Sequence, residues 1–452
     1  MKTNKIITSG LLILLLGFFF PQENGDIIES ELLGTMTASQ VQSQLYSYFG
    51  IPFPDAIYDI SVYRVVYQTE FPDGESILAS GTITIPQNDE FAFPVVSAQH
   101  GTETVRNNVS SVYGFDAINM WLGAYGYITL EPDYIGLGVS QLLHPYHMAT
   151  PSSESIIHMI RASRYFCDDR NDIQYNNQLF LLGYSEGGYT TMAAHKSIEE
   201  NYADEFNVTM SIPMAGAYSL SGVMVDMMLS GVTYSQPYYV AYIMLAYIQY
   251  YEDGNFQDYF TNYYTSLLPG LFDGTHPGWQ INSYLPSIPI NILQPSVIDE
   301  FSQNDQHPLR LALQNNDLYD WTPQASVYLI HGMGDEVVPY ENSQLAYEIF
   351  LANGADDVHL IGLPASLGGH GPVSVYCLLQ ASTILQNHSA TNIHGDVNGD
   401  LAINVLDIVQ MVAIILGTHL PTSYESWAAD VNWDGTVNVL DVVNILGPIL
   451  EP

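Results

Sequence analysis

The sequence predicts an α/β fold, in which a mostly parallel β-sheet is covered on both faces by helices, followed by a small all-α module. Three observations predict this. Short continuous apolar runs alternate with helical stretches, which is typical of buried parallel strands. The alternation stops between residues 217 and 321 and then resumes, as expected of an insertion. Near the C-terminus, Asp396 and Asp430 begin two copies of one pattern, which indicates a separate module.

The chain of 452 residues is strongly acidic, with 48 Asp and Glu against 9 Lys and Arg and a formal net charge of −39. Binding to a phosphate backbone needs many basic groups, so nucleic acid is excluded as a partner. The hydrophobic fraction of 47% excludes disorder for the bulk of the chain. The length favours two domains of unequal size.

The first 24 residues have the pattern of a secretory signal peptide. Lys2 and Lys5 give a positive start, and the apolar run that follows, from Ile6 to Phe20, is too short for a comfortable transmembrane helix. We expect cleavage near residues 21–25 and a mature chain that is secreted or held at the cell surface.

The strands and helices of the α/β part follow in order along the chain. Two β-rich runs between Ile60 and Ile85 flank Pro72-Asp73-Gly74 and predict a hairpin. Further strands are expected at residues 93–99, 127–134, 179–183, 208–216, 326–332 and 358–364. Helices are expected at residues 115–124, 153–167, 186–202, 340–353 and 371–387.

The insertion at residues 217–321 predicts a helical cap over the sheet. It is apolar and rich in tyrosine and methionine. We expect most of these side chains to form the core of the cap itself, and a share of them to line an apolar substrate pocket beneath it.

A nucleophile is predicted at Ser185. The run Gly183-Tyr184-Ser185-Glu186-Gly187 has the pattern G-x-S-x-G and lies between an apolar strand and a helix. A serine on such a sharp turn stands above the sheet at the positive end of the following helix, and the flanking glycines remove Cβ atoms that would collide.

A serine hydroxyl needs a general base, and the base needs a carboxylate that orients it. Asp335 follows the strand SVYLIHG, and His370 follows the strand VHLIGLP. We predict Asp335 as the orienting acid and His370 as the base. Glu336 is the local competitor of Asp335, and His331 is expected to pack against the sheet.

The tetrahedral intermediate of acyl transfer needs backbone donors for its oxyanion. We expect one donor from the amide of Glu186, the residue after the nucleophile. The second is expected from Thr102 or Gly101, in the loop after the strand that ends at Gln99. The glycine-rich turn at residues 133–138 borders the same site and is assigned no chemistry.

The pieces SAQHGT, EPDYIGLG, GYSEGG and HGMGDEVVP together resemble the α/β-hydrolase superfamily over roughly residues 60–388, and within it the secreted lipase and esterase branch. The resemblance implies an α/β-hydrolase domain at residues 25–393 with a mobile cap and a Ser-His-Asp triad acting through an acyl-enzyme. It implies no cofactor for catalysis. The expected substrate is a carboxylic ester, in a lipid or in an acylated polysaccharide.

Two alternatives remain open. A prolyl-oligopeptidase-like serine peptidase shares the nucleophile turn, but such enzymes usually carry a β-propeller before the hydrolase domain, and only a short segment precedes it here. An inactive scaffold for binding is the alternative from another class, against which the intact Ser185, Asp335 and His370 argue. The fold also places Cys167 and Cys377 on opposite faces of the sheet, so we expect no disulfide between them.

Each copy of the C-terminal repeat contains a loop with oxygen-bearing side chains at the spacing of an EF-hand, in which one further ligand is a backbone carbonyl. We predict two structural calcium sites. The expected ligands are Asp396, Asn398, Asp400, Ala402, Asn404 and Asp407 in the first loop and Asp430, Asn432, Asp434, Thr436, Asn438 and Asp441 in the second.

Residues 394–452 resemble a type I dockerin, including Asp as the last ligand of each loop. The resemblance implies attachment to a cohesin-like partner on a scaffold or cell surface. The sixth loop position is Gly435 in the second copy but Leu401 in the first, where a positive φ is costly, so we expect weaker calcium binding there. The helices lack the basic residues that such modules often carry, and packing on its own hydrolase domain is an alternative use of the tail.

Overall fold

The computed structural model describes residues 23–50, 55–170, 173–252 and 254–450. Almost all of the predicted signal peptide lies outside the described residues. Within the described ranges, no helix combines the length and the apolar character that a membrane crossing requires.

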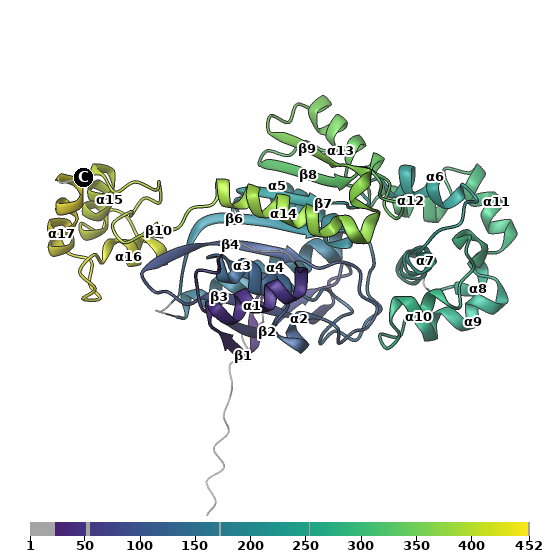
Figure 1. Cartoon of the computed structure of the whole chain (residues 1–452), viewed down its shortest axis with the longest axis horizontal. Helices are drawn as coiled ribbons and strands as arrows, with labels where there is room; N and C mark the ends of the chain where they lie inside the picture. The colour runs from purple at the N-terminus through teal and green to yellow at the C-terminus, as the bar shows by residue number, and fades with distance from the viewer. Residues whose placement is uncertain (1–22, 51–54, 171–172, 253, 451–452) are drawn as a thin grey trace, which may run out of the picture.

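The centre of the molecule is a ten-stranded sheet with helices on both faces (Figure 1). Nine strands follow the order β1-β2-β3-β5-β4-β6-β7-β8-β9, and β10 pairs with β4. Pairing is parallel from β5 to β9 along this order and antiparallel among β1, β2, β3 and β5. The strands are β1 Ile27–Met36, β2 Ile60–Glu70, β3 Ser76–Pro86, β4 Phe91–Gln99, β5 Ile128–Pro132, β6 Gln174–Tyr184, β7 Met210–Met214, β8 Ser326–Gly332, β9 Val358–Leu363 and β10 Asn392–Ile393.

The expected hairpin is formed by β2 and β3, which pair in continuous antiparallel register. Strand β1 and helix α1 (Ala38–Phe49) lie outside the elements expected from the sequence. Most side chains of β1 are exposed, so its apolar alternation is weak. The sequence does contain a start signal for helix α1, because Thr37 and Gln40 form a capping box at its N-terminus.

The helices form one layer on each face of the sheet. Besides α1, they are α2 Ser110–Tyr113, α3 Ala117–Ala124, α4 Ala149–Asp168, α5 Glu186–Asn201, α13 Glu341–Ala352 and α14 His370–His388. Successive strand residues point to opposite faces, so Leu181 packs with α4 and α5 while Leu182 packs with α1, α3 and α14. Cys167 lies in the first of these cores and Cys377 in the second, and no disulfide joins the two described cysteines.

Between β7 and β8 the chain leaves the sheet and forms the expected helical cap (Figure 1). Its elements are η1 Leu220–Met224, α6 Val225–Leu229, α7 Pro237–Tyr251, α8 Phe256–Tyr259, α9 Asn262–Leu271, α10 Gly278–Asn282, η2 Pro289–Ile292, α11 Pro295–Gln303 and α12 Pro308–Gln314. Helix α7 begins with a proline at its first turn, which suits that position. It buries most of its residues, because it is apolar on nearly all sides.

The C-terminal tail lies at the end of the sheet away from the cap (Figure 1). Helices α15 Val405–Ile415, α16 Ser423–Ala429 and α17 Val439–Leu450 share a small core around Met411, Trp427 and Ile445. Ala92 of β4 also belongs to this core, and Asn176 of β6 donates to Asn392 Oδ1 at 2.8 Å. The tail therefore packs at the N-terminal ends of β4 and β6, opposite the ends that carry the candidate site.

Candidate active site

Ser185 lies at the turn where β6 ends and α5 begins, with φ 63° and ψ −121°. A positive φ strains a residue that carries a Cβ, and close packing holds it here. A Cβ on Gly183 would collide with the carbonyl of Gly187, and a Cβ on Gly187 would collide with the carbonyl of Gln99. The two glycines thus allow β4, β6 and α5 to meet closely, with Ser185 at the C-terminal edge of the sheet.

Loops after three strands bring together Ser185, His370 and Asp335. His370 Nε2 lies 2.8 Å from Ser185 Oγ, and His370 Nδ1 lies 2.6 Å from Asp335 Oδ2. A carboxylate on Nδ1 fixes the proton there and leaves Nε2 free to accept the hydroxyl proton. This hydrogen-bonded order is the arrangement that general-base activation of a serine requires.

The side chain of Asp335 is fully buried and firmly anchored. Its Oδ1 accepts the backbone N–H groups of Val337 at 2.9 Å and Val338 at 2.8 Å. Burial acts to raise the pKa of Asp335, but hydrogen bonds from His331 and His370 outweigh it and hold the pKa well below its ordinary value. The group is therefore a carboxylate near neutral pH and can only accept from His370.

Two neighbours of Asp335 have supporting positions. His331 is buried against the sheet, with Nδ1 2.7 Å from Ser343 Oγ and Nε2 2.9 Å from the carbonyl oxygen of Val338. Glu336, the local competitor, instead accepts the backbone N–H of His370 at 3.1 Å. It therefore caps the first turn of α14, a role that the sequence pattern alone did not indicate.

The three residues expected to supply oxyanion donors stand around the nucleophile. A Cβ on Gly101 would lie 4.0 Å from Ser185 Cβ, which places this loop directly beside the serine. Glu186 is the first residue of α5, where backbone N–H groups have no partner inside the helix. The hydroxyl of Thr102 lies 2.9 Å from the hydroxyl of Tyr146, at the wall of the adjoining pocket.

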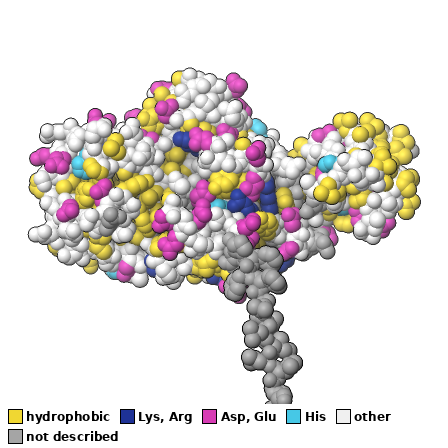
Figure 2. Space-filling model, turned by 180° about the vertical axis from the view of Figure 1, so that it is seen from behind, with side chains coloured by type: hydrophobic (Ala, Val, Ile, Leu, Met, Phe, Trp, Pro, Cys, Tyr) yellow, Lys and Arg dark blue, Asp and Glu magenta, His cyan; other side chains and the backbone are white. Residues whose placement is uncertain are grey.

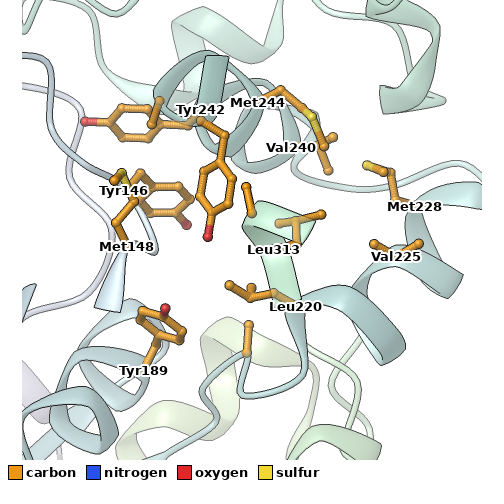
Figure 3. Close-up of a cluster of buried hydrophobic side chains, with 14 of the residues drawn as sticks. Tyr146, Met148, Tyr189, Leu220, Val225, Met228, Val240, Tyr242, Met244 and Leu313 are labelled. Atoms are coloured by element: carbon orange, nitrogen blue, oxygen red, sulfur yellow. The ribbon is translucent and has the colours of Figure 1, made fainter. Parts of the chain in front are cut away.

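An apolar pocket opens at Ser185, between the sheet and the cap. The space not filled by atoms amounts to about 610 Å³, including the part that is open to solvent. Figure 3 shows side chains of its wall and of the packed core behind it. As expected, side chains of the cap line the pocket and also form the core. Tyr234 and Tyr239 line the pocket, whereas Tyr247 belongs to the core. Its apolar wall includes Met224, Met227, Met228, Val240, Met244 and Leu313.

A buried contact between a carboxyl group and a histidine behind the nucleophile was not indicated by the sequence. Glu186 Oε1 lies 2.6 Å from His144 Nε2, and both side chains are almost fully buried. His144 Nδ1 lies 2.7 Å from the carbonyl oxygen of Ile135, so each ring nitrogen of His144 faces an oxygen atom. Burial acts to raise the pKa of Glu186, but the charge and hydrogen bond of His144 outweigh it, and the pKa is lowered.

The residues predicted as calcium ligands lie in two loops of the same shape. In the first loop, the N–H of Asp400 donates to Asp396 Oδ1 and the N–H of Asn398 donates to Asp407 Oδ1, both at 3.1 Å. The second loop repeats these bonds among Asp430, Asn432, Asp434 and Asp441. Among the described residues, no three His, Cys, Asp or Glu side chains gather closely enough to hold an ion. The donor set of carboxylate and amide oxygens nevertheless fits a hard cation such as calcium.

Backbone strain is shared between the two loops. Leu401 has φ 69°, as expected at the sixth position, where the second loop has Gly435. Two residues earlier the second loop has Trp433 at φ 60°, where the first loop has Gly399. Each loop thus holds one non-glycine residue in the left-handed region. Weaker calcium binding by the first loop stays a prediction, and Trp433 introduces the same kind of strain into the second loop.

Comparisons with known proteins divide the chain in the same way. Residues 394–446 match the family model of the dockerin type I domain. A candidate hydrolase from Legionella pneumophila is 27% identical, with a TM-score of 0.74 over 80% of this chain and 98% of its own. A ligand-bound form of the rice cell wall degrading esterase LipA from Xanthomonas oryzae is 26% identical, with a TM-score of 0.71 over 81% of this chain and 98% of its own.

A more distant likeness concerns the fold alone. Lipase A from Candida antarctica in its closed state is 14% identical, with a TM-score of 0.60 over 81% of this chain and 82% of its own. No curated protein sequence matches the chain significantly.

The chain therefore has the α/β-hydrolase fold of esterase-like and lipase-like proteins and carries a dockerin type I domain at its C-terminus. The predicted fold class and both predicted resemblances are confirmed. Dockerin type I domains typically bind calcium and attach to cohesin partners outside the cell.

Proposed function

We propose that this protein is a serine hydrolase of carboxylic esters that works through an acyl-enzyme. The observation that carries the proposal is the hydrogen-bonded order of Ser185, His370 and Asp335 at the mouth of an apolar pocket. The esterases among the similar structures support the same class of reaction.

The geometry supports the following steps. Ser185 Oγ attacks the ester carbonyl carbon while its proton passes to His370 Nε2, and the carboxylate of Asp335 stabilises the imidazolium. The negative oxygen accepts hydrogen bonds from the amide of Glu186 and from Gly101 or Thr102. The bond to the alcohol breaks, and His370 protonates the leaving oxygen. Water then gives a proton to His370 and attacks the acyl carbon. The bond between this carbon and Ser185 Oγ breaks, His370 returns the proton to Oγ, and the acid is released.

The pocket favours an apolar acyl group. Methionine side chains are flexible and polarisable, and the four that line this pocket suit chains or rings of varied shape. The proposed substrates are esters in lipids or in acylated polysaccharides. A dockerin domain favours the second source, because attachment to a scaffold would hold the enzyme near an insoluble polymer.

We assign residues 1–24 to an export signal, 25–393 to the hydrolase domain with its cap at 217–321, and 394–452 to a tail that binds calcium and a cohesin-like partner. The tail offers a surface for such a partner, because hydrophobic side chains gather on this end of the molecule (Figure 2). They occupy the same positions in both copies and are more than half exposed: Val405, Leu406 and Val409 on α15, and Val439, Leu440 and Val443 on α17.

Replacing the nucleophile tests the proposed reaction. We expect Ser185→Ala to lower the turnover of p-nitrophenyl esters by roughly 10³-fold or more, and an organophosphonate to label Ser185 in the wild type. Ser266→Ala, at an exposed serine of α9, is the control and should keep full activity. An aminoacyl anilide run in parallel separates esterase from peptidase activity. Activity retained by Ser185→Ala, or faster cleavage of the anilide than of any ester, would refute the proposal.

A further inference from the structure

Tyr134, in the glycine-rich turn at residues 133–138, lies directly under the loop that carries Gly101 and Thr102. Its side chain is only 1% exposed, and its φ of 72° places it in the left-handed region. A non-glycine residue keeps such a conformation only where the surrounding contacts hold it. This tyrosine contacts the residues next to both expected oxyanion donors, Glu186 and the loop of Gly101 and Thr102.

Two successive peptide groups of the oxyanion loop are held by their carbonyl oxygens. The hydroxyl of Tyr134 donates to the carbonyl oxygen of His100 at 2.9 Å. The ring of His100 reaches forward, with Nδ1 2.7 Å from the carbonyl oxygen of Gly101. In a trans peptide the C=O and N–H groups point in opposite directions. These two bonds therefore set the directions of the N–H groups of Gly101 and Thr102, which donate to no other group in the described part of the chain.

The same tyrosine is tied to the nucleophile helix. Its hydroxyl lies 3.1 Å from Thr190 Oγ1 on α5. Its ring is stacked on the ring of His100, with centroids 4.2 Å apart, and on that of His144, with centroids 5.8 Å apart. His144 is the partner of the Glu186 carboxylate. Tyr134 therefore contacts residues that hold both expected oxyanion donors in place: His144 beside Glu186, and His100 in the loop of Gly101.

We propose that Tyr134 is a positioning residue for the oxyanion hole, whose hydroxyl orients the second backbone donor relative to Ser185. This inference rests on the proposed ester hydrolysis and extends it to a residue that does not touch the substrate. An oxyanion donor acts on the transition state, in which the charge on oxygen develops. Loss of its orientation should therefore lower kcat and leave KM almost unchanged.

The test compares two tyrosines that lose the same group. Tyr134→Phe keeps the ring and its stacking and removes only the hydroxyl. Tyr67→Phe is the matched control, because Tyr67 is also fully buried and its hydroxyl donates to a backbone carbonyl, that of Ser155 on α4, at 2.8 Å rather than to the loop of Gly101. Tyr134→Phe loses the contacts with His100 and Thr190, so its stability should fall at least as far as that of Tyr67→Phe, which loses one buried hydrogen bond.

The two variants should differ in catalysis. With p-nitrophenyl butyrate, we expect Tyr134→Phe to lower kcat by about 10-fold at unchanged KM, a part of the loss that removal of a whole donor causes. The inhibition constant of a trifluoromethyl ketone, whose adduct carries an oxyanion, should rise by the same factor. Tyr67→Phe should show wild-type values of both. His100→Phe, which keeps a ring but loses the donor to Gly101, should act in the same direction as Tyr134→Phe.

Each outcome decides the matter. The positioning role would be overturned if Tyr134→Phe and Tyr67→Phe had the same kcat, or if KM and the inhibition constant of Tyr134→Phe rose by the same factor. The proposed function would still stand in that case, provided that Ser185→Ala is inactive. An active Ser185→Ala would overturn both. If Tyr134→Phe does not fold, an unaltered kcat in His100→Phe would still refute the inference.

Discussion

The two loops proposed to bind calcium allow a prediction about backbone strain. Leu401 has φ 69° and a side chain that is 57% exposed, so it costs strain and gains little packing. An L-residue in the left-handed region costs roughly 1–2 kcal/mol. Glycine removes this strain but adds about 0.5–1 kcal/mol of unfolded-state entropy. The net gain from Leu401→Gly is about 1 kcal/mol, which corresponds to about 5-fold tighter calcium binding at the first site, because binding and folding of the loop are coupled.

The second loop should respond differently to the same change. Trp433 is also in the left-handed region, but its ring centroid lies 3.8 Å from that of His394. Trp433→Gly relieves the backbone and loses this aromatic contact, which contributes about 0.5–1.5 kcal/mol. We therefore expect the affinity of the second site to change by no more than about 2-fold.

Calorimetric titration of the decalcified full-length chain measures both sites. Leu401→Ala is the control, because it removes the side chain but keeps the Cβ and hence the strain. It should bind calcium like the wild type. If Leu401→Ala tightens the first site as much as Leu401→Gly does, the gain does not come from backbone strain and the explanation is wrong.

Two further predictions concern the hydrolase domain. Val240→Phe, which narrows the pocket from α7, should lower kcat/KM for decanoyl esters by about 10-fold and leave kcat/KM for acetyl esters unchanged. Gln249→Phe, on the exposed side of α7, is the control and should leave kcat/KM unchanged for both kinds of ester. Equal losses on all esters in Val240→Phe would contradict the pocket assignment. Burial lowers the pKa of His147 to about 4, below its unfolded value of about 6.5, so its contribution to stability is complete above pH 6.5 and is lost as the pH falls towards 4. At pH 5 the loss of folding free energy is on the order of 2 kcal/mol. His147→Asn removes the titrating group, and asparagine tolerates the positive φ at this position. The melting temperature of this variant should therefore fall less between pH 7 and pH 5 than that of the wild type.

The identity of the fold and of the proposed triad could be predicted from local pattern. Each strand that carries a proposed catalytic side chain is a continuous apolar run, and the turn after it contains the side chain, so the parallel sheet alone places Ser185, Asp335 and His370 at one edge. The edge strand β1 was not predicted, because most of its side chains are exposed and its apolar alternation is weak.

The supports of the site could not be predicted in this way. Glu336 and Asp335 are adjacent acids, and only the geometry shows that one binds the imidazole while the other caps α14. Likewise, Trp433 carries no mark of a strained position in a list of expected ligands, because φ follows from the closed path of the loop.

By itself, therefore, the sequence determined the α/β fold, the cap, the two repeated loops and the residues of the proposed triad, because periodicity, turn glycines and repeat spacing act between near neighbours in the chain. The tertiary structure alone decided which tyrosines line the pocket and that His144 pairs with Glu186, 42 residues away. It also decided that Tyr134 reaches the carbonyl of His100. Such contacts depend on how loops that follow different strands pack together at one edge of the sheet. A pattern among near neighbours in the chain carries no information about this packing.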